Sequence, residues 1–205
     1  MKEPLRFVEI TDINDDLLLP WLDLYEISFP PEEKVFVSYF LALLKDKAKG
    51  LRADSYMTAA VDGDGALVGL MRFDANIEQT AYLWYLAVHP DMQGQGVGSF
   101  CHDEVLQRSR EAGARAAVME VEIPEEISDP QHRKRAEMRI EFYKRHGALL
   151  LRGIRYIHSV GPHQPEIPLH IMICPFESIT PQEAFGMAKW LFGESLTQVG
   201  ELRLV

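Results

Sequence analysis

The sequence is poor in several features that mark particular classes of protein. It has only two cysteines, Cys101 and Cys174, with no CxxC pair and no histidine at zinc-ligand spacing, so we expect two buried thiols and neither a disulfide framework nor a bound metal. No apolar run is long enough to cross a bilayer, and the charged amino terminus lacks the apolar core of a signal peptide. These absences predict a cytoplasmic protein without a membrane partner.

Positive charge is also scarce. The chain carries 21 Lys and Arg against 31 Asp and Glu, a formal net charge of −10. This balance argues against nucleic acid as a partner and favours a cationic or amine-bearing substrate. No lysine lies between Gly50 and Lys134, which excludes a P-loop in that region, because a P-loop needs a lysine directly after its glycines.

The remaining composition is that of a globular protein. A chain of 205 residues that is 47% hydrophobic can bury its own core, which predicts a single domain over residues 1–205. Hydrophobic periodicity and breaker residues predict strands near 5–10, 55–61, 66–74, 82–88, 116–122, 149–157 and 170–175. They predict helices near 14–28, 32–47, 97–112, 130–146 and from 181 onward. So many strands exceed a simple alternating βαβ chain and indicate a mixed, mainly antiparallel α+β sheet.

The segment HPDMQGQGVGSF, residues 89–100, places three glycines between a predicted strand and a predicted helix. Glycine adopts positive φ without a steric penalty, so successive N–H groups can turn toward one concavity at the start of the helix. Such a concavity favours an anionic group, above all a phosphate. A Rossmann fingerprint is excluded, because Gly94 and Gly96 are followed by Ser99 and three strands precede the one that leads into the loop.

The wider pattern resembles the GNAT superfamily of N-acetyltransferases. Gln93–Gly98 fits the motif Gln/Arg-x-x-Gly-x-Gly/Ala behind the apolar strand Tyr85–Val88, and Val118–Val121 and Phe142–Gly147 follow in the order of the family. The resemblance covers roughly residues 5–175. It implies an α+β fold with a central, mostly antiparallel sheet of about six to seven strands between helices, in three α/β/α layers.

The resemblance also implies a co-substrate, acetyl-CoA, and no metal. In the family the glycine loop holds the pyrophosphate of coenzyme A, and the preceding strand splays from its neighbour to leave main-chain groups for the pantetheine arm. The implied contacts are Leu86, Ala87, Val88, Gln93, Gly94, Gln95, Gly96, Val97, Gly98 and Ser99. The chain departs from many members in lacking an asparagine between Met119 and Tyr143, where Ala136 and Arg139 fall at the family's Asn and Ala positions.

Tyr143 is the candidate for the proton donor. It lies at helical spacing on the face of Ala136 and Ile140, so its ring points inward, and a phenol with a pKa near ~10 can donate a proton. The resemblance assigns it the role of general acid toward the leaving thiolate. The alternative is an ordinary core tyrosine with a satisfied hydroxyl.

Glu120 and Glu122 are the candidates for the proton acceptor. They share one face of an otherwise apolar strand, which is unfavourable unless that face meets a cleft or partners. Similarity of Met119-Glu120-Val121 to the Leu-Glu-Val strand of the alanine acetyltransferases of ribosomal proteins favours Glu120 over Glu122. Salt bridges to neighbouring arginines are the alternative.

The expected acceptor is a small-molecule or peptide amine, and the family places its variable acceptor contacts in loops that correspond to 29–33 and 158–164. An alternative function is an acyl-CoA-binding sensor or assembly module without catalysis. This alternative comes from residues 177–205, expected as a helical extension whose apolar stripe, Ala184, Ala188 and Leu191, packs on the same chain or in a homodimer.

Overall fold

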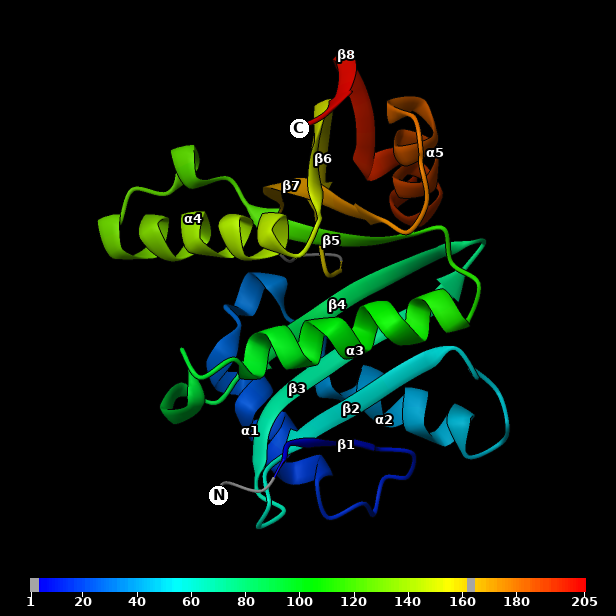
Figure 1. Ribbon diagram of the computed structural model, residues 1–205, viewed down its shortest axis with the longest axis vertical. Coiled ribbons are helices and arrows are strands. Elements are labelled where there is room, and N and C mark those ends of the chain that lie inside the picture. The colour runs from blue at the N-terminus through cyan, green and yellow to red at the C-terminus, as the bar shows by residue number, and fades with distance from the viewer. Residues whose placement is uncertain (1–3, 162–164) are drawn as a thin grey trace.

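The computed structural model describes residues 4–161 and 165–205. Over these residues the chain forms eight strands in one sheet and five α-helices, joined by short 3₁₀ turns (Figure 1). The strands are β1 (Arg6–Glu9), β2 (Ser55–Val61), β3 (Leu67–Ile77), β4 (Thr80–Val88), β5 (Ala116–Glu122), β6 (Leu149–His158), β7 (Ile167–Pro175) and β8 (Leu196–Leu204). The helices are α1 (Leu18–Ser28), α2 (Val37–Lys47), α3 (Val97–Glu111), α4 (Pro130–Arg145) and α5 (Pro181–Phe192).

The sheet has the order β1-β2-β3-β4-β5-β7-β6-β8. Each pair of neighbours in the described chain is antiparallel except β4 and β5, which are parallel and joined through α3. The mixed, mostly antiparallel GNAT-like sheet predicted from the sequence is therefore confirmed, with eight strands instead of the expected six to seven. The β4–β5 pair at the centre is the place where the chain crosses from one half of the sheet to the other.

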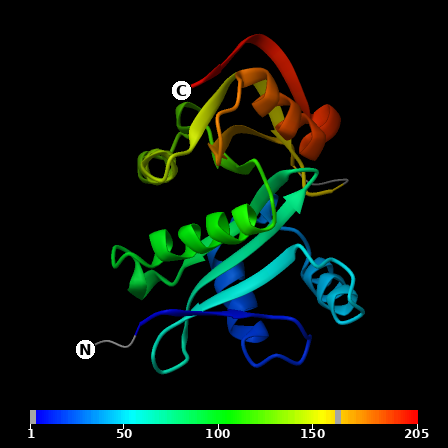
Figure 2. The same ribbon diagram turned by 45° about the vertical axis from the view of Figure 1, so that its right-hand side comes forward.

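Helices cover both faces of the sheet, as Figures 1 and 2 show. On β5, Ala117, Met119 and Val121 pack in the core beneath α3 and α4, whereas Ala116 and Val118 pack with α5 on the opposite face. The helices α1 and α2 share that opposite face and cover the amino-terminal half of the sheet. Both cysteines are free, buried thiols, as expected. In the described part of the chain, no helix combines the length and the apolarity that crossing a membrane requires.

The carboxyl-terminal extension differs from its prediction. Thr180 caps the helix with a capping box, as its spacing indicates, but the helix ends at Phe192, and Leu196–Leu204 forms the eighth strand beside β6. The purely helical extension over 177–205 is thus corrected. Gly193, with φ 53°, turns the chain out of the helix, and the alternation of Leu202 and Leu204 with charged residues is a strand pattern. Ala184 and Ala188 pack against their own sheet.

Candidate active site

The strands β4 and β5 run side by side only at their beginnings. The parallel ladder joins residues 80–83 to residues 116–119 and ends there. The register between β3 and β4 shifts between Arg72 and Phe73, which leaves Trp84 as an extra residue of β4. A bulge bends its strand and interrupts pairing, so the rest of β4 stays with β3 on one side and leaves its other side open. The bulge lies just before Leu86–Val88, the stretch where the family resemblance implies that the strand splays from its neighbour.

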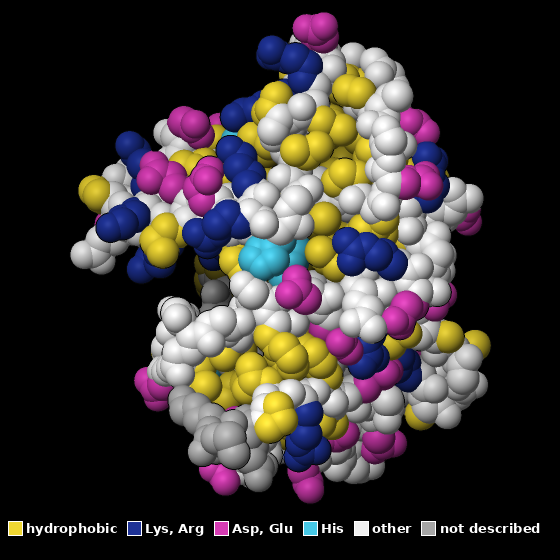
Figure 3. All heavy atoms as spheres, viewed as in Figure 1, with side chains coloured by type: hydrophobic (Ala, Val, Ile, Leu, Met, Phe, Trp, Pro, Cys, Tyr) yellow, Lys and Arg dark blue, Asp and Glu magenta, His cyan; other side chains and the backbone are white. Residues whose placement is uncertain are grey.

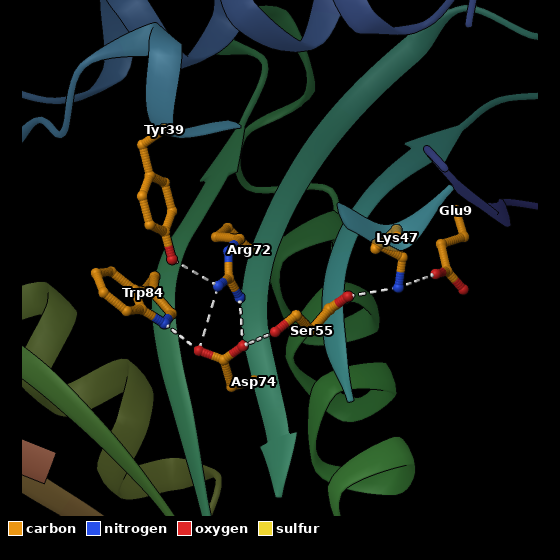
Figure 4. Close-up of polar contacts among 7 residues, drawn as sticks. All are labelled: Glu9, Tyr39, Lys47, Ser55, Arg72, Asp74 and Trp84. Carbon is orange, nitrogen blue, oxygen red and sulfur yellow. Dashed lines mark hydrogen bonds and ion pairs between the residues drawn. The ribbon is translucent and has the colours of Figure 1, made fainter. Parts of the chain in front are cut away.

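A buried polar network fixes the side chain of Trp84 (Figure 4). Its indole Nε1 donates to Oδ2 of Asp74 at 2.6 Å. The same carboxylate accepts hydrogen bonds from the guanidinium of Arg72 at 3.1 and 3.2 Å and from the hydroxyl of Ser55. Arg72 is 1% exposed and also donates to the Tyr39 hydroxyl at 3.0 Å. A buried charge pair with this many partners holds the bulge in one geometry.

The glycine loop enters α3 through two residues in the left-handed region. Gly94 has φ 73° and Gly96, the N-cap of α3, has φ 85°. A Cβ at either position would meet no atom within 4 Å, so the backbone conformation, rather than space, requires glycine here. The first N–H groups of a helix have no acceptor within it, and a helix amino terminus attracts anions. The loop is therefore able to hold a phosphate or pyrophosphate group.

A groove of about 760 Å³ runs from this loop along the open side of β4. Figure 3 shows the molecular face hollowed below α4. The groove is lined by five of the ten predicted cofactor residues, Leu86, Ala87, Val88, Gln93 and Gly98. The other five, Gly94, Gln95, Gly96, Val97 and Ser99, lie in the adjoining loop and first helical turn and do not line it. Val97 has its side chain in the core, which leaves its main chain alone for a ligand.

A small inner pocket of about 60 Å³ lies beside the groove, between β4 and β5, and shares the lining residues Leu86, Glu122 and Tyr143 with it. Because these strands diverge, side chains from both faces of the sheet reach this pocket. Tyr143 comes from α4 on one face, lines both cavities and is 7% exposed. Burial raises the pKa of Tyr143 to about 12, so its phenol keeps the proton at neutral pH and is able to donate it.

The two predicted proton acceptors reach the same pocket, and each is held by a basic side chain. Oε1 of Glu120 accepts from the hydroxyls of Tyr82 and Tyr156, the latter at 3.0 Å, and Oε2 lies 2.6 Å from Nδ1 of His158. Burial alone would lower the pKa of His158, but the hydrogen bond and the charge of Glu120 raise it above its ordinary value. The imidazole is thereby favoured in its charged form beside Glu120.

Glu122 forms an ion pair with Arg139 from α4 and lies 3.4 Å from Nε2 of His132. Burial opposes ionisation of Glu122, but the adjacent charge of Arg139 and hydrogen bonds lower its pKa below the ordinary value. The arginine salt bridge that the sequence left as an alternative is present at this residue. Arg139 departs from the family pattern, and its place one helical turn before Tyr143 puts it on the same helix face.

Sequence reasoning missed a third carboxylate. Glu33 ends the 3₁₀ turn Pro31–Glu33 between α1 and α2, lines the inner pocket and is half-buried. In the described part of the chain its carboxylate forms no hydrogen bond or ion pair. Burial and the nearby charge of Glu122 raise the pKa of Glu33 to about 7. The family pattern indicated the loop 29–33, but no spacing rule singled out this residue. The other expected acceptor loop includes residues 162–164, which lie outside the described residues.

Comparison with known proteins places this geometry in a family. The chain matches the model of the acetyltransferase (GNAT) family over residues 21–148. No curated protein sequence matches it. Among solved structures, a GNAT-family protein from Bacteroides thetaiotaomicron is similar with a TM-score of 0.67 and 20% identity, over 92% of this chain and 98% of that one.

Two further structures share the fold. The ribosomal-protein-S18-alanine N-acetyltransferase from Escherichia coli has a TM-score of 0.54 and 17% identity, over 86% of this chain and 97% of that one. An acetyltransferase from Bacillus subtilis in complex with CoA has a TM-score of 0.54 and 14% identity, over 85% of this chain and 100% of that one. With the family model spanning more than half of its length, the chain belongs to the GNAT family of acetyl-CoA-dependent acyltransferases.

Proposed function

We propose that the protein transfers the acetyl group of acetyl-CoA directly to a primary amine of a small molecule or peptide. One observation carries this proposal: where β4 diverges from β5, a glycine loop, an open strand edge and a buried proton donor lie along two adjoining cavities that share Leu86, Glu122 and Tyr143 in their walls. The groove lies between the glycine loop and Tyr143, so a long anionic thioester anchored at the loop can present its reactive end to the inner pocket.

The residues present fit coenzyme A. The main chain of Gly94–Ser99 would hold the pyrophosphate, because its glycines and helix amino terminus suit an anion. Leu86, Ala87 and Val88 would hold the pantetheine arm, since alternate residues of a strand direct their N–H and C=O groups to its unpaired side. Arg135 adds a cation to the groove wall. When bound, acetyl-CoA supplies the acetyl group as a thioester.

The chain's own residues would then perform three tasks. An N–H of the open β4 edge would stabilise the negative charge that develops on the thioester oxygen. The Tyr143 hydroxyl would protonate the departing sulfur, since it is buried and keeps its proton at neutral pH. A carboxylate of the inner pocket, Glu120, Glu122 or Glu33, would take a proton from the amine.

The experiment is an acceptor screen with two readouts. The protein is incubated with acetyl-CoA and a panel of peptides, lysine, polyamines, aminoglycosides and small amines, and both free thiol and acetylated product are measured. We expect thiol release that depends on the acceptor and equals the amount of amide formed. Tight binding of acetyl-CoA without amine-stimulated release across the panel would instead identify a sensor and refute the proposal.

A further inference from the structure

The carboxylates of the inner pocket are unequal in their partners. Glu120 is paired with His158 and Glu122 with Arg139, so when His158 is protonated these two carboxylates and two cations balance one another. Glu33 has no such cation in the described part of the chain. When Glu33 is ionised, it therefore contributes the one uncompensated charge among these five groups. A charge of this kind attracts a cation from solvent, and the proposed acceptor is an amine.

Resting on the acetyl transfer proposed above, we propose that Glu33 is the catalytic base, which binds the acceptor as its ammonium ion and removes a proton from it. The chemical class that this assigns to the acceptor is a primary amine that is protonated in solution. The base then comes from the loop between α1 and α2, and Glu120 and Glu122 serve as positioning residues.

The position of Glu33 is fixed relative to the strand that carries the open edge. Its carbonyl oxygen accepts a hydrogen bond from the Tyr85 hydroxyl at 2.7 Å, and the N–H of Val35 donates to the same hydroxyl at 3.1 Å. The ring of Phe29 packs edge-on against that of Tyr85, with centroids 4.8 Å apart. Tyr85 follows the bulge at Trp84 and precedes Leu86, so one side chain ties the loop of Glu33 to the main chain of the cleft.

The carboxylate of Glu120 is already engaged by three side chains. Both of its oxygens already accept hydrogen bonds, from two tyrosines and from the imidazole of His158. Glu122 is held ionised by Arg139 and would lose that ion pair on protonation. Glu33 loses no such partner when it is protonated. Geometry therefore favours Glu33 as the group that cycles between its two states.

The charges around Glu33 support the same assignment. Burial raises the pKa of Glu33, and Glu122 and Glu120 on β5 raise it further, whereas Arg139 on α4 and His158 at the end of β6 lower it. The result is a pKa of about 7. A base of this kind is half ionised near neutral pH, where it both accepts a proton readily and returns it to solvent.

The proton balance closes without a further reactant. The ammonium gives one proton to Glu33, which later releases it to solvent. The C–N bond then forms as the C–S bond of the thioester breaks, the sulfur takes the proton of Tyr143, and the second proton lost by nitrogen restores the phenol through solvent. The products are an amide, the thiol of coenzyme A and one proton.

The test compares Glu33→Gln with Glu32→Gln and Glu120→Gln, using an acceptor identified by the screen. Glu32 is the matched control, since it lies in the same 3₁₀ turn and does not line the inner pocket. The measurements are kcat/KM for the acceptor from pH 5.5 to 9.5, the Kd for acetyl-CoA and the melting temperature. In the wild type we expect kcat/KM to rise with pH through an apparent pKa near ~7, in addition to any limb from the amine itself.

In Glu33→Gln we expect this limb to disappear and kcat/KM to fall by about 10²-fold or more, with the Kd for acetyl-CoA unchanged. Glu32→Gln should keep the wild-type profile. Glu120→Gln should keep the rise of kcat/KM through the apparent pKa near ~7. A folded Glu33→Gln enzyme that retains the limb and the rate would overturn the inference while leaving acetyl transfer intact. Loss of the limb in Glu120→Gln alone would return the role to Glu120. Failure of the proposed function would show differently, as a wild type without amine-dependent turnover.

Discussion

An unpaired carboxylate in a pocket should weaken the fold, and Glu33→Gln measures by how much. The pKa of Glu33 is raised from 4.5 to about 7 in the folded chain. Between these values the folded protein binds a proton that the unfolded chain has released, so stability falls as pH rises through this window. At about 1.4 kcal/mol for each unit of pKa, the full difference corresponds to about 3 kcal/mol above pH 7. Solvent contact of the half-buried side chain screens part of this, which brings the expected value to between about 1 and 3 kcal/mol.

The assay is urea unfolding of the wild type, Glu33→Gln and Glu32→Gln at several pH values from 5 to 9. Glutamine keeps the size and polarity of the side chain but has no charge, so we expect Glu33→Gln to be more stable than the wild type at pH 8. The gain should shrink to below about 1 kcal/mol at pH 5, where the folded carboxyl is already protonated. Glu32→Gln should follow the wild type throughout. A gain that is absent, or that is equal at every pH, would refute the placement of an unpaired charge at Glu33.

The other predictions concern the proton donor, the bulge and the glycine loop. Tyr143→Phe should lower kcat by about 10²-fold and leave the Kd for acetyl-CoA within about twofold, as measured by steady-state kinetics and titration calorimetry. Asp74→Asn leaves the charge of Arg72 buried without its partner and should lower the free energy of unfolding by about 3–5 kcal/mol in urea titrations. Gly96→Ala forces a side chain to φ 85°, at a cost of about 1–2 kcal/mol, and should raise the Kd for acetyl-CoA by about tenfold without changing the amine preference.

Much of the fold could be predicted because its signals are local. The apolar run before His89 indicates a buried central strand, and the glycines that follow it take the positive φ values that their spacing suggested. Tyr143 could be placed on the inward face of α4 from helical spacing alone, and it does line the cleft. The last strand was not predicted, because Leu196–Leu204 has only a short alternating pattern and becomes a strand by pairing with β6.

The side chains that pair with the carboxylates of the site could not be predicted from the sequence, because they come from elements far apart in the chain. The charges that face Glu120 and Glu122 belong to His158 at the end of β6 and Arg139 on α4. Only the sheet order, which places β7 and β6 after β5, brings the first of these near. Glu33 approaches from the other side of β4 through the hydroxyl of Tyr85, a contact between residues 52 positions apart. The strand spacing of Glu120 and Glu122 thus indicated where the pocket lies. It did not indicate which carboxylate of the pocket lacks an ion-pair partner.

Glu33 and Glu120 differ in their partners, so replacing each of them should show whether it serves catalysis or the stability of the fold. Replacing a side chain that stabilises the fold should lower the free energy of unfolding, and any loss of activity then follows from the lower stability. For Glu33 the structure requires opposite signs: the neutral variant should be more stable at alkaline pH and much less active at the same pH. For Glu120, which satisfies two buried tyrosine hydroxyls and an imidazole, replacement should lower both. The sign of the stability change at pH 8 therefore distinguishes a group that the pocket retains for chemistry from one that it retains for structure.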